Sequence, residues 1–117
     1  ALIAAVTASG LPTDEIHFGG FLPVKPGQRR KRLSQLMLAG GTLVLYESPY
    51  RISRLLTELT DLAPLRSIVL MREITKKFEE HLHGTATELL ERLKERKLKG
   101  EWVALIGSKD RTAAVNT

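Results

Sequence analysis

Two short runs of apolar residues, separated by an amphipathic segment, limit what this chain can fold into. Residues 42–47 (TLVLYE) and 67–72 (SIVLMR) are almost continuously apolar and contain β-branched side chains, which is typical of buried strands. Between them, residues 52–62 carry leucine and isoleucine at spacings of three and four. That spacing predicts a helix with one apolar face against a core. The order strand–helix–strand favours an α/β domain.

The rest of the chain continues this alternation. The further expected elements are helices over residues 1–9, 28–39 and 85–98 and strands over residues 16–22, 78–83 and 101–106. Strand 16–22 contains a glycine pair, which often marks a bulge or a close backbone approach. Because only a short connection joins strands 67–72 and 78–83, we expect them to pair as an antiparallel hairpin. We predict a three-layer α/β domain with a mixed five-stranded sheet.

Capping residues define two helix starts in this scheme. Ser48 and Pro49 are expected as N-cap and first residue of the helix after strand 42–47. Thr85 and Glu88 have the spacing of a capping box and should open the helix that ends near Leu98. The domain is expected to occupy residues 1–107, and a polar tail residues 108–117.

Composition narrows the class of protein. A length of 117 residues suits one domain, and 43% hydrophobic with 26% charged residues is the balance of a globular protein. The chain has no cysteine, which excludes disulfides and thiolate metal sites. No stretch has the pattern of a signal peptide or a membrane span, so we expect a cytoplasmic protein without membrane contact. Ala1 lies inside a helix-like run without a cap, so we expect the sequence to belong to a longer protein.

The charge of the chain mildly favours a polyanionic partner. It has 18 basic and 13 acidic residues, a formal net charge of +5. The densest basic cluster consists of Lys25, Arg29, Arg30, Lys31 and Arg32. We interpret this cluster as a surface for RNA phosphates, and the alternative is a solvated helix start. Aromatic residues make up only 5%, which argues against a single-strand binder built on stacked rings.

Two other groups of polar residues favour a structural interpretation. The basic run 92–99 alternates with Glu91 and Glu95, as on a solvated helix face with ion pairs. His81 and His83 would share one strand face, but no third ligand is evident, and we predict no metal site. The sequence also lacks a phosphate-binding P-loop and a dinucleotide-binding glycine motif.

Charged residues stand at the ends of both buried strands. Glu47 follows the first strand, and Arg72 and Glu73 end the second. Arg51 comes soon after the first group and Lys76 after the second. Ligands of open α/β sheets gather at the carboxyl ends of strands, so we expect a site there. The structural alternative is a buried ion pair, Glu47 with Arg72 or Glu73 with Arg51.

Four segments in this order and spacing resemble a known family: ASGLPTDEIHFGGFLP, TLVLYESPYR, LMREITKKFEEHLHGT and KGEWVALI. They are similar to the C-terminal half of RsmI-type small-subunit ribosomal RNA 2′-O-methyltransferases, within the tetrapyrrole (corrin/porphyrin) methylase superfamily. The sequence departs from the family pattern at Tyr50, where histidine is expected. The resemblance implies a second domain of an enzyme whose cleft holds S-adenosyl-L-methionine between two domains. It also implies ribosomal RNA and the small ribosomal subunit as partners, an absent N-terminal domain and a homodimer.

The resemblance also implies which residues approach the cofactor and the substrate. The implied cofactor-binding residues are Ala1, Tyr46, Glu47, Met71, Arg72, Glu101 and Trp102, largely through their backbone. Arg51 joins the basic cluster as an implied RNA contact. Methyl transfer to a ribose 2′-hydroxyl requires removal of its proton. Glu47 or Glu73 could assist that removal, and Arg72 or Lys76 could stabilise the alkoxide. The alternatives are a tetrapyrrole methyltransferase and a non-catalytic α/β RNA-binding module.

Overall fold

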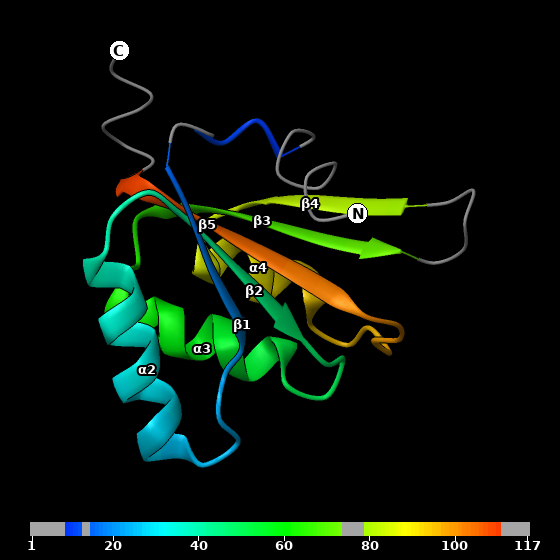
Figure 1. Cartoon of the computed structure of the whole chain (residues 1–117). Helices are drawn as coiled ribbons and strands as arrows, with labels where there is room; N and C mark the ends of the chain where they lie inside the picture. Colours follow the sequence, from blue (N-terminus) through cyan, green and yellow to red (C-terminus); the bar gives the residue numbers. More distant parts are fainter. Residues whose placement is uncertain (1–8, 13–14, 74–78, 111–117) are drawn as a thin grey trace.

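The computed structural model describes residues 9–12, 15–73 and 79–110, and these residues form a five-stranded mixed sheet (Figure 1). The strands are β1 (Ile16–Phe21), β2 (Thr42–Glu47), β3 (Arg66–Glu73), β4 (Glu79–Gly84) and β5 (Trp102–Asp110), in the spatial order β1-β2-β5-β3-β4. Strand β1 pairs with β2 in parallel, and all other pairs are antiparallel. The predicted hairpin of β3 and β4 is confirmed.

The last strand determines how the ends of the others are arranged. Strand β5 lies between β2 and β3 and runs antiparallel to both. Strands β2 and β3 are therefore parallel to each other, and their carboxyl ends lie at the same edge as the start of β5 (Figure 1).

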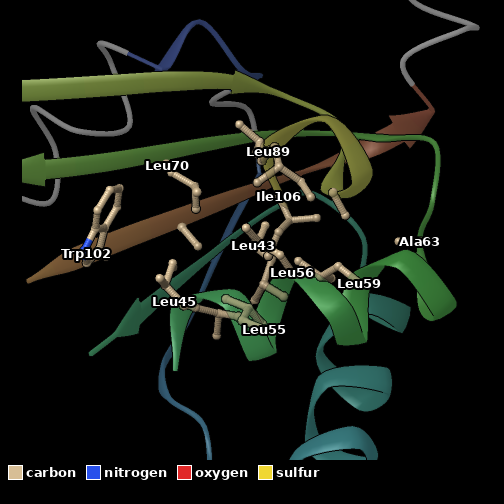
Figure 2. Packing of buried hydrophobic residues seen from close by; sticks show 14 of the residues in the cluster. Leu43, Leu45, Leu55, Leu56, Leu59, Ala63, Leu70, Leu89, Trp102 and Ile106 are labelled. Carbon is tan, nitrogen blue, oxygen red and sulfur yellow. The ribbon is translucent and has the colours of Figure 1, made fainter. Parts of the chain in front are cut away.

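The described helices cover one face of this sheet (Figure 1). They are α2 (Pro26–Leu38), α3 (Ile52–Leu62) and α4 (Ala86–Leu93). Figure 2 shows leucines of α3 and α4 packing against strand side chains that include Leu43, Leu70 and Ile106. The expected apolar face of α3 is confirmed, since its leucine and isoleucine side chains belong to the larger core cluster. The mixed α/β fold is thus as predicted.

The opposite face of the sheet carries a smaller apolar cluster. Val44, Val69, Met71 and Leu105 are buried there, with Leu11 and Val103 packed against them. The predicted three-layer arrangement requires a helix on this face as well, and α2, α3 and α4 all lie on the other face (Figure 1). The opening helix expected over residues 1–9 lies outside the described residues apart from Ser9.

The chain between β2 and α3 differs from the prediction. Helix α3 begins at Ile52 with Arg51 as its N-cap, so Ser48 and Pro49 do not start it. Instead the carbonyl oxygen of Ser48 accepts hydrogen bonds from the amides of Arg51 and Ile52 and forms a turn. The amide of Ser48 donates to the carboxylate of Glu47, 3.1 Å away.

Two further boundaries were predicted wrongly. The Thr85–Glu88 capping box is present, but α4 ends at Leu93 rather than near Leu98. Lys94 leaves the helical region with ψ 133°, and Glu95 has a φ of 67°, so the helical hydrogen bonds cannot continue. Strand β5 extends to Asp110, into the expected tail, because the backbone there pairs with Arg66 of β3.

Glycines allow β1 to lie close to its neighbours. The expected bulge in β1 is confirmed, since the register with β2 shifts between Phe18 and Gly20. A Cβ atom on Gly19 would lie 2.7 Å from Leu45 and 2.8 Å from Leu36. At the start of β2, Gly41 has a φ of 72°, and a Cβ there would lie 2.5 Å from the carbonyl oxygen of Glu15.

The substitution Gly41→Ala should lower the free energy of unfolding by about 1–3 kcal/mol. Alanine is strained at this φ and would collide with the Glu15 carbonyl, which accepts the Thr42 amide at 2.9 Å. Gly27→Ala is the matched control, since a Cβ at Gly27 meets nothing within 4 Å. Chemical denaturation of both variants measures the difference. Equal stability of Gly41→Ala and the wild type would contradict this account.

The chain after α4 is held to the sheet by Glu80 of β4. Oε1 of Glu80 accepts from Nη2 of Arg96 at 2.7 Å and lies 3.1 Å from Nη2 of Arg72. The hydrogen bond from Arg96, with the charges of Arg96, Arg72 and Arg92, lowers the pKa of Glu80 against the opposing effect of burial. Glu80 therefore connects β4, β3 and the segment after α4.

Glu80→Gln should remove part of the acid dependence of stability. The folded state has the lower pKa, so the contribution of Glu80 is fully present above about pH 4.3, the pKa of an unfolded glutamate. It is lost as the pH falls from there through the folded-state pKa. The melting temperatures of wild type and variant should differ at pH 7 and converge toward pH 3. Glu91→Gln, at an exposed residue of α4, is the control. A constant difference across this range would exclude the ionised Glu80 as its cause.

Candidate functional site

The three strand ends expected to form a site meet in one row. Glu47 at the end of β2 pairs with Trp102 at the start of β5, and Trp102 pairs with Arg72 near the end of β3. One residue inward, Tyr46, Val103 and Met71 form the next row. The expected convergence of these segments at one edge of the sheet is therefore observed (Figure 1).

The two rows face opposite sides of the sheet. Trp102 is fully buried in the core on the helix-covered side, and alternation along the strands places Glu47 and Arg72 on that side too. The guanidinium carbon of Arg72 lies 5.4 Å from the centre of the Trp102 ring, within cation–π range. Met71 belongs to the apolar cluster on the other side.

Aromatic rings gather next to this edge. Tyr46, half-buried on the side away from the helices, lies 5.3 Å from the ring of Phe18 and 5.5 Å from the ring of Phe21. Phe18 and Phe21 are themselves exposed. The few aromatic residues of the chain are thus partly concentrated on β1 and β2, which the composition could not reveal.

A buried network of charges lies directly behind the end of β2. Nη2 of Arg29, on α2, donates to Glu47 at 3.1 Å and to Glu58 of α3 at 2.8 Å. Nε of Arg29 donates to both carboxylate oxygens of Glu58 at 3.2 Å. Nε of Arg51 donates to the other oxygen of Glu47 at 3.2 Å. Two cations and two carboxylates therefore join α2, β2 and α3.

This network corrects the prediction for Arg29. Its side chain is 0% exposed, so it cannot reach an RNA phosphate as the other members of the basic cluster could. Burial alone would lower the pKa of Arg29, but hydrogen bonds and charges of Glu58 and Glu47 outweigh it and raise the pKa above its ordinary value. Arg29 is therefore a permanently charged part of the core.

The predicted ion pairs of Glu47 and Arg51 also need correction. Glu47 does not pair with Arg72, which contacts Glu80 instead; Glu47 and Arg51 pair with each other. Both oxygens of Glu47 accept hydrogen bonds, from Arg29, Arg51 and the amide of Ser48. A carboxylate that accepts three hydrogen bonds and is 2% exposed is poorly placed to take a proton from a substrate, which argues against the expected proton-accepting role of Glu47.

Three buried polar atoms at the same edge have no hydrogen-bond partner among the described residues: Oγ of Ser48, Nε of Arg72 and Nε1 of Trp102. Buried polar groups are nearly always paired, with other protein groups or with ordered water. Ser48 follows Glu47 directly, and Arg72 and Trp102 are register partners. These three atoms therefore keep unused hydrogen-bonding capacity at this edge, although all three are buried in this structure.

The other predicted site residues either lie outside the described part of the chain or stand at the outer ends of β3 and β5. Ala1 and Lys76 lie outside the described residues. Glu73 is the last residue of β3, where its backbone pairs with Glu79. Glu101 is exposed, immediately before β5.

The rest of the basic cluster lies on the surface. Lys25, Arg30, Lys31 and Arg32 are exposed around the start of α2, a helix with no acidic residue in its first turn. Arg30 forms an exposed ion pair with Asp61 at 3.2 Å. Without Arg29, these residues remain available for an anionic partner. Of the second basic run, only Arg92 lies on α4; Arg96 contacts Glu80 instead.

Sequence reasoning missed the acidic partners of Arg29 and Arg72. A signal for the first was present, since Arg29 lies four and seven residues before Leu33 and Leu36, on the apolar face of α2. Glu58 interrupts the apolar stripe of α3 in the same way. No comparable spacing marks Glu80.

Metal and membrane sites are not found in the part of the chain that the structure describes. No group of three or more histidine, cysteine, aspartate or glutamate residues there could hold a metal ion. His81 and His83 lie opposite Met71 and Val69 in β3 and share one strand face, as expected. Among the described helices, none is long and apolar enough to span a bilayer.

Known proteins resemble this chain in sequence and in fold. A protein from Xylella fastidiosa strain Temecula1, named ribosomal RNA small subunit methyltransferase I, is 44% identical over 97% of the chain and 43% of its own length. A protein of the same name from Mesorhizobium japonicum is 43% identical over 92% of the chain and 37% of its own length. The chain thus spans less than half the length of these curated relatives.

Solved structures give the same fold at low sequence identity. The methyltransferase CobJ superposes with a TM-score of 0.64 at 23% identity, over 92% of this chain and 47% of that one. Uroporphyrin-III C-methyl transferase from Thermus thermophilus, in complex with S-adenosyl homocysteine, gives a TM-score of 0.54 at 22% identity, over 95% and 51%.

The family model of the tetrapyrrole (corrin/porphyrin) methylases matches residues 1–90, most of the chain. This match, which covers more than half of the chain, identifies the chain as a member of the tetrapyrrole (corrin/porphyrin) methylase family.

Proposed function

We propose that this chain is the C-terminal domain of a cytoplasmic methyltransferase that uses S-adenosyl-L-methionine to methylate a ribose 2′-hydroxyl of small-subunit ribosomal RNA. The observation that carries the proposal is the edge where Glu47, Trp102 and Arg72 meet beside three unpartnered polar atoms. Relatives of this chain are named ribosomal RNA small subunit methyltransferases. The proposed partners are an N-terminal domain, the small ribosomal subunit and a second copy of the enzyme.

The residues at this edge fit a nucleoside-like cofactor. The cofactor supplies the methyl group, and the protein has to hold it and orient the acceptor hydroxyl. Backbone amides and carbonyls at Tyr46–Glu47, Met71–Arg72 and Glu101–Trp102 can bind an adenine edge, which needs one donor and one acceptor. The unpartnered atoms of Ser48, Arg72 and Trp102 add donors at the same edge. Ala1 is proposed to contribute from the chain before β1.

Removal of the hydroxyl proton is assigned by elimination among the strand-end carboxylates. Both oxygens of Glu47 are engaged, which leaves Glu73, at the end of β3, to assist proton removal. Arg72 or Lys76 would stabilise the developing negative charge on the ribose oxygen. The second domain of the cleft could contribute the same function.

The exposed basic residues at the start of α2 are proposed to contact RNA phosphates, together with Arg51. The competing function is a tetrapyrrole methyltransferase, whose carboxylate-bearing substrate needs fewer basic contacts than an RNA backbone does. Similarity to CobJ below 25% identity indicates only the fold, whereas the sequence relatives favour the RNA enzyme.

This chain alone should bind S-adenosyl-L-methionine weakly or not at all, and the enzyme of the relatives' length should bind it well. A cleft between two domains buries most of its ligand, and one wall leaves most of it in water. Isothermal titration calorimetry with both proteins tests this. Submicromolar binding to this chain alone would contradict a two-domain cleft.

Replacing Arg30, Lys31 and Arg32 by glutamine should weaken binding to small ribosomal subunits and reduce its salt dependence. Each lost phosphate contact changes the slope of log K against log salt by about 0.7–0.9, so three contacts predict a change of about 2–3 units. Lys94, Lys97 and Lys99, also exposed, give a control triple-glutamine variant with the same loss of charge. Equal slopes for the two variants would mean that the α2 residues have no specific role.

A further inference from the structure

Arg29 differs from its neighbours in the basic cluster by being completely buried. It follows the exposed Gln28 and precedes the exposed Arg30, yet its side chain is 0% exposed. Its guanidinium contacts carboxylates on two other elements, Glu58 on α3 and Glu47 at the end of β2. It also points Nη1 toward the carbonyl oxygen of Pro23, 3.5 Å away.

The free energy of folding alone does not explain why charged residues, rather than apolar ones, occupy this part of the core. Removing ions from water costs several kcal/mol each, and apolar side chains of similar volume often do as well or better than a buried ion pair. A guanidinium does offer geometry that an apolar side chain lacks, because its planar donors fix the direction of each carboxylate. The presence of an arginine therefore favours a role in fixing the orientation of one of the carboxylates that it contacts.

Glu47 is the one of these carboxylates that reaches the site. Its Oε2 is held by Arg29, which leaves Oε1 directed at Nε of Arg51 and at the amide of Ser48. That amide lies at the point where β2 gives way to the turn, next to the unpartnered Oγ of Ser48. Across the sheet, the backbone of Glu47 pairs with Trp102.

We propose that Arg29 is a positioning residue, which through Glu47 fixes the backbone of residues 46–48 for the cofactor and touches neither cofactor nor RNA. The proposal rests on the proposed function, because it takes this edge as the cofactor site. It assigns the basic cluster two separate tasks. Arg29 serves cofactor binding from inside, and Arg30, Lys31 and Arg32 serve RNA binding from outside.

The first test is the double substitution Arg29→Met/Glu58→Met in the full-length enzyme. It removes one cation and one carboxylate together, so no charge is left unpaired in the core and the Glu47–Arg51 pair remains. We expect a melting temperature close to that of the wild type and an S-adenosyl-L-methionine Kd raised about tenfold, since small misplacements of binding groups are costly. Calorimetry and thermal unfolding give both values.

The control is the double substitution Arg30→Met/Asp61→Met, which removes the exposed ion pair between the same two helices. We expect it to leave the cofactor Kd unchanged and to reduce the salt dependence of RNA binding. Arg29→Lys keeps the charge but cannot hold two carboxylates with planar donors. It should weaken cofactor binding without changing the salt dependence of RNA binding.

The outcomes separate this inference from the proposed function. If the full-length wild-type enzyme does not bind S-adenosyl-L-methionine, the proposed function is wrong. Normal binding in the wild type and an unchanged Kd in a stable Arg29→Met/Glu58→Met enzyme would overturn the positioning role alone. If Arg29→Met/Glu58→Met lowers the salt slope of RNA binding and leaves the cofactor Kd unchanged, Arg29 is an RNA contact after all.

Discussion

The arrangement of this domain depends on the placement of β5 between β2 and β3. Because β5 is antiparallel to both, β2 and β3 end at the same edge of the sheet, with the start of β5 between them. Glu47, Trp102 and Arg72 thereby form one row. No local feature of β2 or β3 alone would bring these residues together, so the candidate site is a consequence of topology.

Charge and polarity at this edge are organised in two ways. On the β2 side, Glu47 is fully engaged by Arg29, Arg51 and the amide of Ser48, which fixes the backbone. On the β3 side, Nη2 of Arg72 contacts Glu80, and the guanidinium group lies over the ring of Trp102. Nε of Arg72 has no hydrogen-bond partner among the described residues. The first arrangement satisfies every oxygen of the carboxylate, and the second leaves a buried donor without a partner in the described part of the chain.

The sequence was sufficient where periodicity and strand composition decide the structure. The apolar runs of β2 and β3, the stripe of α3 and the Thr85 capping box were all recognised, and with them the α/β class. Boundaries set by local backbone conformation were missed. A turn over residues 48–51 precedes α3, and Lys94 and the left-handed Glu95 end α4 early. Pairing with β3 extends β5 into the expected tail, and a cross-strand contact of this kind has no signature in local sequence.

The basic cluster shows why charge counts alone could not assign function. Five cations between residues 25 and 32 predict one surface for an anionic partner. Successive residues of a helix are rotated by about 100°, however, so a continuous run of residues must also supply the buried face of the helix. Arg29 occupies that face with Leu33, and it is stable there only because Glu58 and Glu47 come from other elements. The same run of sequence therefore contains an exposed basic surface and a buried arginine that is paired with carboxylates of β2 and α3. The position of each residue around the helix axis, rather than its charge, decides whether it is buried or exposed.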